Sequence, residues 1–358
     1  MKIVFLVNNI NPGNGWGHYA RDLINGLRIR GCSIVILKES RDNLEGKAII
    51  RRGLGIIYSV LRMVIDKDVR SSDIIHAVDV YPFGVIAFLA NIILRKKIII
   101  SALGTYSVAP LYGKISWIAK KSLKSMDRIV AISSFTKDQI QAAVPNLLVD
   151  VIKPGIDYKA FHIRHEDILR PYILSVGALK YRKGYHISIP AFAKARKDIP
   201  DLEYIIIGSQ DNKYFEELKI LAHKYGVEEG IKFIKNVPDD EMRQIYSRAK
   251  IFILTSINQG NHFEGFGLVF LEAAAAGLPV IGTLGNGIED AIDAGHNGVL
   301  VPQGDIDMTS KNIVKMIKDK NLWASMSQES YKLSEQNDID IAIDCYVDIY
   351  SNLVKNGL

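Results

Sequence analysis

Two glutamates separated by seven residues are the side chains of this sequence best spaced for chemistry. Glu264 and Glu272 belong to the segment EGFGLVFLEA, which follows the strand-like run IFILT. Gly265 and Gly267 let the backbone approach a ligand closely before an alanine-rich helix begins. The free N–H groups at the start of that helix, assisted by the helix dipole, would hold an anion such as a diphosphate.

The spacing of the two glutamates describes the ligand further. At a rise of 1.5 Å per residue, Glu272 lies about 7.5 Å beyond Gly267 along the helix axis. One carboxylate therefore precedes the anion site and the other lies beyond it, which suits a ligand with hydroxyls on both sides of a diphosphate, such as a nucleotide sugar. The alternative is a salt-bridged pair of structural glutamates, and the two glycines favour the ligand.

A second group of charged residues follows a predicted strand in the segment GALKYRKG, residues 177–184. Its cations are Lys180, Arg182 and Lys183. Cations at this place can neutralise a diphosphate and stabilise it as the leaving group when a glycosidic bond breaks. The alternative is an ordinary basic turn in solvent.

A glycine-rich turn, NPGNGWG at residues 11–17, follows the first predicted strand and leads into a helix that ends before Gly31. Taken alone, this turn is a weak indication, because similar turns occur in many nucleotide-binding folds.

Short β-branched runs alternate with helical patterns along the chain, which predicts βαβ units and parallel sheets. The first series of predicted strands comprises residues 3–7, 33–37, 74–77, 97–101, 128–132 and 149–153. The second series comprises residues 172–176, 204–207, 231–234, 251–255, 279–282 and 298–301. Because the pattern restarts, the sequence predicts two doubly wound α/β domains.

The polar segment 161–171 lies between the two series, ends in proline and is the expected linker. We expect an N-terminal domain of residues 1–163, joined by a closing helix at 339–358, and a C-terminal domain of residues 164–338. Ligands of such sheets bind at the carboxyl ends of the strands, so the cleft between the domains is the expected site. The closing helix should bury Ile341, Ile343, Cys345, Tyr346, Ile349, Tyr350 and Leu353, which recur at helical spacing.

Several segments, taken in order, resemble the retaining GT-B glycosyltransferases of family 4. They are AISSFT at 131–136, KPGID at 153–157, SVG through KG at 175–184, and the two-glutamate segment at 264–273. The resemblance covers nearly the whole chain. It implies the GT-B fold, in which two Rossmann-like domains face each other across a cleft and a C-terminal helix packs back on the first. It also implies an NDP-sugar of the UDP or GDP type as donor substrate, without a cofactor.

The resemblance also implies roles for individual residues. Glu264 would contact the hydroxyls of the donor sugar and Glu272 the ribose, while Lys183 and Arg182 would stabilise the departing NDP. The loop 285–290 would close over the phosphates. The remaining donor-binding residues are Gly15, Gly177, Phe266, Gly267, Leu268, Val269, Asn236 and Val237, and Thr105 and Tyr106 would line the acceptor side.

The sequence departs from the family pattern at several positions. Ala178 stands where an arginine is expected, and Arg182 is a better substitute for that charge than Lys180. Leu103 stands where similar enzymes have a histidine, and Asn14 replaces a glycine. Retention by a front-face route needs no enzymic nucleophile, because the departing phosphate can take the acceptor proton. The departures leave two alternatives open, a catalytically silent GT-B protein that binds a nucleotide sugar and another GT-B enzyme such as an epimerase.

Metal-dependent catalysis is not expected. Three Asp-x-Asp triplets begin at Asp66, Asp305 and Asp338, and all lie in helix-flanking stretches where acidic caps are common. We therefore interpret them as caps or solvated faces and predict no metal. Histidines are expected to be structural or exposed: His18, His76, His186 and His262, of which His262 is the one to test because of its nearness to Glu264.

The distribution of charge indicates an anionic partner. Of 358 residues, 48% are hydrophobic and 23% charged, as in a globular protein. Residues 1–165 contain 24 Lys and Arg against 12 Asp and Glu, and the remainder 21 against 27. Segments 51–65 and 111–126 mix basic and apolar residues, as interfacial helices do, although ordinary amphipathic helices would do the same. The acceptor would be a growing surface glycan or a lipid-linked sugar, and no motif indicates nucleic acid.

The location follows from three further features. The longest apolar stretch, Val85 to Leu94, is too short to span a membrane. The N-terminus looks like a buried strand and not a signal peptide. Cys32 and Cys345 are far apart in apolar patterns, which favours buried free thiols in a reducing compartment. We expect a cytoplasmic protein, at the inner face of the membrane if the two basic segments bind lipid.

Overall fold

The structure, a computed structural model, describes residues 1–11, 13, 15–166 and 168–355. The chain forms two compact units: unit 1 comprises Met1–Pro154 with Ile339–Leu358, and unit 2 comprises Gly155–Asp338. Asn14 of the glycine-rich turn lies outside the described residues. The segment 161–171, expected as the linker, is bonded to unit 2, since the Tyr331 hydroxyl donates to the Ile163 carbonyl (2.9 Å) and Arg248 pairs with Glu166 (3.0 Å).

Unit 1 is built on a parallel sheet of six strands in the order β2-β1-β3-β4-β5-β6. Its strands are β1 Lys2–Val7, β2 Ser33–Lys38, β3 Ile74–Val78, β4 Lys97–Ala102, β5 Arg128–Ala131 and β6 Asp150–Val151. Its helices are α1 Gly15–Ile29, α2 Ile56–Ile65, α3 Lys67–Arg70, α4 Val85–Leu94, α5 Thr105–Val108, α6 Ser116–Lys124, α7 Ser134–Ala143 and α15 Ile339–Lys355, with short turns η1 Gly53–Gly55, η2 Val80–Gly84 and η3 Ala109–Leu111.

Unit 2 repeats the arrangement with the order β12-β11-β10-β7-β8-β9. Its strands are β7 Tyr172–Val176, β8 Glu203–Ile207, β9 Ile231–Ile234, β10 Ile251–Ile253, β11 Val280–Thr283 and β12 Gly298–Val301. Its helices are α8 Tyr158–Phe161, α9 Tyr185–Asp198, α10 Lys213–Lys224, α11 Asp239–Arg248, α12 Leu268–Ala275, α13 Ile306–Lys318 and α14 Lys320–Gln336, with short turns η4 Tyr181–Lys183, η5 Glu228–Gly230 and η6 Gly287–Asp290.

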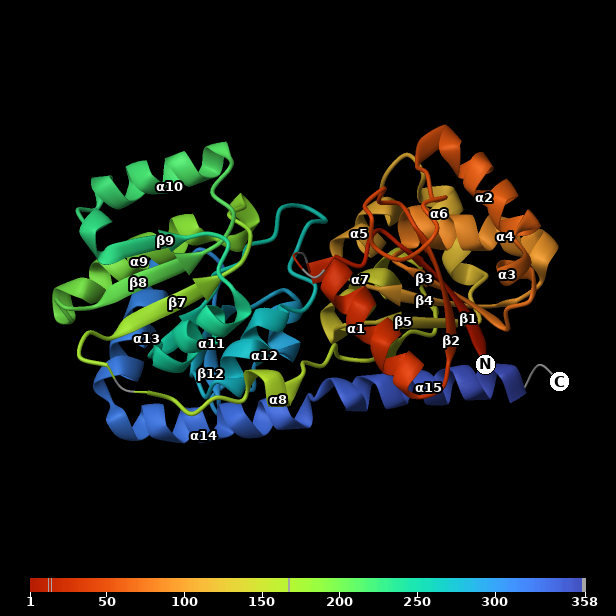
Figure 1. The fold of residues 1–358 in the computed structure, drawn as a ribbon. Coiled ribbons are helices and arrows are strands. Elements are labelled where there is room, and N and C mark those ends of the chain that lie inside the picture. The colour runs from red at the N-terminus through yellow and green to blue at the C-terminus, as the bar shows by residue number, and fades with distance from the viewer. Residues whose placement is uncertain (12, 14, 167, 356–358) are drawn as a thin grey trace. The chain divides into compact units, whose positions relative to one another are not determined.

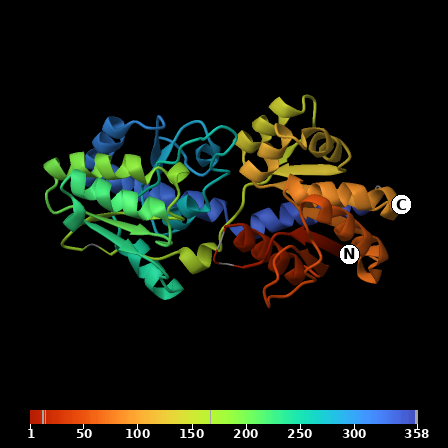
Figure 2. The ribbon, with the colours of Figure 1, turned by 90° about the horizontal axis from the view of Figure 1, so that it is seen from above.

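The prediction of two doubly wound α/β sheets is confirmed. Figures 1 and 2 show helices on both sides of each sheet, as crossovers between parallel strands require. Several strands differ from the predicted ranges by one residue, and two differ by more. β6 has two residues, whereas a strand at 149–153 was expected. β10 ends at Ile253, and the Thr255 hydroxyl beyond it donates to the Gly184 carbonyl.

The closing helix α15 packs on unit 1 close to α1. A Cβ atom at Gly26 would lie 1.9 Å from Cδ1 of Ile343, so only glycine permits this approach. The Tyr346 and Tyr350 hydroxyls bond Ser101 Oγ (2.6 Å) and His76 Nδ1 (2.6 Å), which ties the helix to the sheet. His76 is thus structural, as expected.

Two residues expected to be buried in this helix are exposed. Cys345 is a free, exposed thiol, and Ile341 is 51% exposed, because both lie outside the face that Ile343, Tyr346 and Tyr350 bury. Cys32 is free and buried, as predicted.

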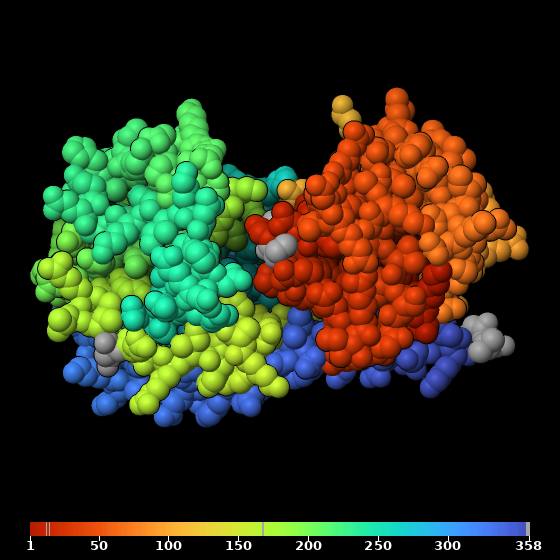
Figure 3. Space-filling model, viewed as in Figure 1, coloured from red at the N-terminus to blue at the C-terminus, as the bar shows by residue number. Residues whose placement is uncertain are grey.

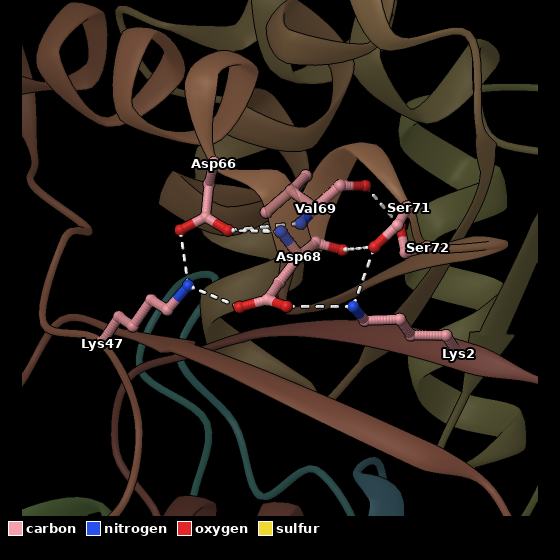
Figure 4. A network of polar contacts seen from close by, with 7 residues as sticks. All are labelled: Lys2, Lys47, Asp66, Asp68, Val69, Ser71 and Ser72. Carbon is pink, nitrogen blue, oxygen red and sulfur yellow. Dashed lines mark hydrogen bonds and ion pairs between the residues drawn. The ribbon is translucent and has the colours of Figure 1, made fainter.

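The first Asp-x-Asp triplet is a structural cap within an ion-pair network (Figure 4). Asp66 accepts hydrogen bonds from the N–H groups of Asp68 and Val69, at the start of α3. Lys47 Nζ lies 2.6 Å from Asp66 and 2.9 Å from Asp68, and Lys2 lies 3.0 Å from Asp68. These two ammonium groups lower the pKa of Asp68 to about 2.

The other two triplets also flank helices. Asp305 caps α13 by accepting from the Met308 N–H (2.8 Å). Asp338 directly precedes α15 and forms a β-bridge with Ile156.

Candidate functional site

Three charged residues that lie far apart in the sequence meet in unit 2. Glu264 Oε2 lies 2.6 Å from Lys183 Nζ and 3.0 Å from Arg182 Nη1. The side chains of Glu264 and Lys183 are each 12% exposed and that of Arg182 is 27% exposed. Segment 177–184 and the two-glutamate segment at 264–273 therefore meet in one cluster, in which two cations share one carboxylate.

The electrostatics of this cluster favour an anion. Burial raises the pKa of the Glu264 carboxyl, but Lys183 and Arg182 outweigh that effect and hold it below its usual range. Glu264 is consequently ionised at neutral pH. Two cations and one carboxylate leave a formal charge of plus one in a largely buried place, where Coulomb interactions are stronger than in water.

A close backbone contact holds the turn that carries the two cations. Gly184 has φ 74°, and a Cβ atom there would lie 1.7 Å from the Thr255 carbonyl oxygen. The Thr255 hydroxyl donates to the Gly184 carbonyl (2.7 Å), and the Ile257 N–H donates to the Arg182 carbonyl (2.8 Å). The segment after β10 therefore fixes η4 in place, which explains why a glycine must follow Lys183.

The end of β7 lies beside this cluster. A Cβ atom at Gly177 would lie 3.9 Å from Lys183 Nζ, so the turn folds back over the strand end. Ala178 and Lys180 are both exposed. Within the part of the chain that the structure describes, Lys180 has no ion pair, whereas Arg182 pairs with Glu264.

The start of α12 presents backbone N–H groups next to Glu264. Gly267 has φ 87° at the helix start, and the first N–H groups of a helix have no acceptor within it. Leu268 and Val269 are half-buried, while the side chain of Phe266 is only 2% exposed. Phe266 can therefore reach a ligand only through its backbone, because its ring belongs to the core.

The loop after β11 holds the backbone of the segment that carries Glu264. The Gly287 N–H donates to the Glu264 carbonyl (2.9 Å), and a Cβ atom at Gly287 would lie 1.9 Å from the Gly265 carbonyl oxygen. The loop 285–290 is thus in contact with the two-glutamate segment. Glu289 accepts from the Gly285 N–H within this loop.

Glu272 lies in α12 and has a partner that sequence reasoning missed. The Tyr246 hydroxyl, from α11, donates to Glu272 Oε2 (2.9 Å) and is fully buried. Burial, reinforced by the negative charge of Glu272, raises the pKa of Tyr246 well above its usual value, so the tyrosine stays a donor. Nothing in the sequence marks this pair, because the two residues are 26 positions apart on different helices.

Asn236 and Val237, predicted near the nucleotide base, follow β9. Asn236 is exposed and has φ 55°, a backbone conformation that asparagine tolerates, and Val237 is half-buried. They lie at the carboxyl end of their strand, as a ligand-binding loop of such a sheet should.

In unit 1 the glycine-rich turn differs from expectation. A Cβ atom at Gly15 would meet nothing within 4 Å, whereas one at Gly17 would lie 2.1 Å from the Asn11 carbonyl oxygen. The close approach therefore requires Gly17. The intervening Trp16 packs on Tyr106, with ring centroids 4.1 Å apart.

The two residues expected on the acceptor side differ in exposure. Thr105 is 8% exposed and Tyr106 is 45% exposed. Only the second presents a substantial side-chain surface.

A buried carboxylate next to these residues was not recognised in the sequence. Asp79 follows β3, is 2% exposed, and lines a small pocket with Asn8, Asn9 and Trp16. Its Oδ1 accepts from the Leu103 N–H (3.0 Å) and the Ser107 hydroxyl (2.5 Å), which positions the turn that holds Thr105 and Tyr106. Burial raises the pKa of Asp79 to about 6.

Comparison with known families decides the class of protein. The family described as Glycosyltransferase Family 4 matches residues 13–160, and the family described as Glycosyl transferases group 1 matches residues 162–333. Taken together, the two matches support a group 1 glycosyltransferase. The predicted class of protein is thereby confirmed, whereas the stereochemistry of the transfer is not addressed by these matches.

Curated relatives of this glycosyltransferase are distant. A GDP-mannose-dependent alpha-(1-6)-phosphatidylinositol monomannoside mannosyltransferase is 26% identical in Mycobacterium tuberculosis, over 72% of each chain, and 26% identical in Mycolicibacterium smegmatis, over 61% of this chain and 63% of the relative. A D-inositol 3-phosphate glycosyltransferase of Corynebacterium jeikeium is 29% identical over 53% of this chain and 46% of its own length. The chain thus matches between about half and three-quarters of the length of these relatives.

Solved structures of glycosyltransferases share the fold. A glycosyltransferase from Rickettsia africae has a TM-score of 0.82 at 18% identity, covering 99% of both chains. Anabaena Alr3699/HepE in complex with UDP-glucose has a TM-score of 0.82 at 20% identity, covering 98% of this chain and all of that one. The predicted GT-B fold is confirmed.

Two further features of the glycosyltransferase concern metals and membranes. No group of three or more His, Cys, Asp or Glu side chains in the described ranges could hold a metal ion. No helix within those ranges is both long enough and apolar enough to cross a bilayer.

The other three histidines singled out in the sequence have partners outside the charged cluster. His18 pairs with Asp22 (2.8 Å), and His186 bonds the Tyr214 hydroxyl (2.7 Å). His262 is exposed and takes part in a β-bridge with Gln259.

Proposed function

We propose that the protein transfers a hexose, with retention of anomeric configuration and without a metal, from a UDP- or GDP-sugar to a hydroxyl of an acceptor. The observation that carries this proposal is the cluster of Glu264, Lys183 and Arg182. Its net positive charge and its position beside the start of α12 suit a sugar diphosphate. The names of relatives, which include GDP-mannose-dependent enzymes, and the UDP-glucose complex of a structural neighbour are consistent with such a donor.

The chemistry assigns each group a task. Lys183 and Arg182 would stabilise the charge that develops on the diphosphate as its bond to the sugar breaks, helped by the N–H groups at the start of α12. Glu264 would accept hydrogen bonds from sugar hydroxyls, which requires the ionised form that its two cations maintain. The acceptor hydroxyl would attack from the face that the diphosphate leaves, and its proton would pass to the departing phosphate oxygen.

Glu272 and Tyr246 would act on the nucleoside. A carboxylate on the helix beyond the anion site can accept both hydroxyls of a ribose, and the Tyr246 hydroxyl fixes one of its oxygens (2.9 Å). The acceptor would be a growing surface glycan or a lipid-linked sugar, bound near Tyr106. No nucleic acid is involved in this proposal.

Thermal stabilisation by a panel of UDP- and GDP-sugars, in the presence of EDTA, tests donor binding, because a ligand of the folded state raises the melting temperature. Proton NMR of the product then gives the anomeric configuration. A product of inverted configuration would overturn retention. A complete dependence of turnover on Mn²⁺ would overturn metal independence.

A catalytically silent protein that binds a nucleotide sugar is the second candidate, and Ala178 favours it. This alanine is exposed beside the cluster at the place where similar enzymes have an arginine. The same experiment separates the two candidates: a silent protein is stabilised by the donor but releases neither NDP nor free sugar from it, even slowly.

A further inference from the structure

Helix α2 exposes its apolar side chains and buries a polar one. Its buried residues are Ser59 and Met63. An ordinary surface helix has the opposite arrangement, with its apolar stripe against the core. The apolar residues that α2 and the turn before it expose recur at helical spacing: Leu54 at 93%, Ile57 at 66%, Tyr58 at 46%, Leu61 at 59% and Ile65 at 64%.

Hydrogen bonds fix this orientation. Ser59 is fully buried, and its hydroxyl accepts from the Arg51 N–H (2.8 Å) and donates to the Ile49 carbonyl (3.1 Å). A rotation of α2 that buried Leu61 would expose Met63 and break both bonds. The outward apolar stripe is therefore built into the fold of unit 1.

The end of the neighbouring helix exposes further apolar side chains. α4 packs against α2 (Figure 1), and its last turn exposes Ile92 at 65% and Ile93 at 63%. Arg95 and Lys96 follow at once. The orange atoms of this part of the chain lie at the surface of unit 1 in Figure 3.

The three segments that carry these side chains contain basic residues and no acidic ones, and Asp66 and Asp68, which directly follow α2, are paired with Lys47 and Lys2. Segments 51–65, 85–96 and 111–126, which contain α2, α4 and α6, have nine Lys and Arg and no Asp or Glu. Arg52 pairs with Glu39, but the other eight have no ion pair with any described residue. Arg51 lies over the Tyr58 ring, 5.8 Å from its centroid, and Arg62 is exposed on α2, next to Leu61 in the sequence.

The structure alters the contribution expected of segment 111–126. Leu111, at the end of η3, and Leu123, in α6, are both fully buried, as in an ordinary amphipathic helix that covers the unit. Only Trp117, at 68%, remains as a strongly exposed apolar residue of α6, among lysines. The apolar surface therefore belongs to α2 and the end of α4, and α6 adds mainly charge.

We propose that the exposed face of α2, with the end of α4, docks on an anionic lipid bilayer. Exposed aliphatic side chains insert into the boundary between headgroups and acyl chains, and unpaired basic residues attract anionic headgroups. A protein partner of ordinary composition carries basic residues of its own, and a surface that binds it would offer acidic residues to pair with them. The three segments contain no acidic residue. This binding does not depend on the proposed reaction, so it is measured without donor or acceptor.

Flotation of the purified chain with vesicles of phosphatidylcholine, alone or mixed with phosphatidylglycerol, measures the binding. We expect binding to the anionic vesicles that weakens as salt is raised. The double variant Ile57→Ser/Leu61→Ser should weaken it by roughly tenfold or more, because two aliphatic side chains no longer leave water. Ile220→Ser, at a residue that is 70% exposed on α10 of unit 2, is the matched control and should bind like the unchanged protein.

The charge is tested separately. Arg62→Gln should weaken binding about fivefold, the contribution of one basic residue near an anionic surface. An unchanged melting temperature in each variant excludes unfolding as the cause.

Two results would overturn the proposal. The first is equal binding by the double variant and the unchanged protein. The second is that the unchanged protein forms a dimer in solution and does not bind vesicles, and that the double variant is a monomer. That result would assign the face to a second copy of the chain.

Discussion

Removing Arg182 tests whether one arginine replaces the missing charge at position 178. Arg182 Nη1 lies 3.0 Å from Glu264 Oε2, beside the place proposed for the diphosphate. A unit charge about 5 Å away, at an effective dielectric constant of about 20, interacts with such a cation by about 3 kcal/mol. That energy corresponds to about 150-fold in rate, and solvent around a side chain that is 27% exposed lowers it.

We therefore expect Arg182→Ala to lower kcat by roughly 10- to 1000-fold, with a smaller change in donor affinity, because charge on the leaving group develops only in the transition state. The assay is release of NDP from the donor that binds, at saturating donor. Lys180→Ala is the matched control, since Lys180 belongs to the same turn, is exposed and has no ion pair among the described residues. Melting temperatures of both variants show whether the fold is intact.

A second substitution makes the test positional. Ala178→Arg in the Arg182→Ala background should recover part of the lost rate, because residue 178 directly follows the end of β7 beside the cluster. The reasoning is refuted if Arg182→Ala is silent while Lys180→Ala is not. If neither matters and Ala178→Arg raises turnover from near zero, the natural protein is a donor-binding relative without catalysis.

Other predictions concern neighbouring residues. Glu272→Ala should mainly weaken donor binding and Glu264→Ala mainly lower kcat, since ribose contacts are equal in ground and transition states; equal and negligible effects would remove both roles. EDTA should leave turnover unchanged in a coupled assay of NDP release. Gly184→Ala should strongly lower the melting temperature, because its Cβ meets the Thr255 carbonyl at 1.7 Å, whereas Gly226→Ala, with φ 65° and nothing within 4 Å, should lower it much less.

Asp79 gives a pH-dependent prediction in the same group. Its pKa is raised from 3.8 to about 6 in the folded protein, so folding favours the protonated form, and stability falls by roughly 2 kcal/mol as pH rises from 4 to 7. Asp79→Asn removes this term, so its melting temperature should rise relative to that of the unchanged protein over this range. A difference that stays constant with pH would contradict the assignment.

The fold could be predicted from local pattern because parallel strands buried on both faces are continuous apolar runs. The runs at 172–176, 231–234 and 298–301 became strands with unchanged limits. For segment 111–126 the sequence left an interfacial helix and an ordinary amphipathic helix open, because helical spacing gives the members of a face but not the side on which that face packs; the burial of Leu111 and Leu123 favours the second. Only the contacts of α6 decide that side.

Pairs formed by tertiary packing were also beyond the sequence. Glu264 and Lys183 could be assigned to one site because each resembles a known segment, but their direct contact depends on the segment after β10 holding Gly184. Tyr246 and Asp79 lie in segments for which no such resemblance was found. The glycine-rich turn contains several glycines, and only the position of Asn11 shows that the close approach falls on Gly17.

The departure at Ala178 has a geometric interpretation. What a departing diphosphate requires is a cation at a point in space, and the turn 181–183 folds back so that Lys183 Nζ would lie 3.9 Å from a Cβ atom at Gly177. Arg182 Nη1 shares Glu264 Oε2 with that ammonium group (3.0 and 2.6 Å), so a side chain from position 182 can serve the region that a side chain from position 178 would otherwise reach. If that substitution is complete, Ala178→Arg in the otherwise unchanged protein adds a third cation beside one carboxylate and should change kcat little. A large gain from this single change would show that Arg182 only anchors Glu264 and that the charge at the strand end is missing.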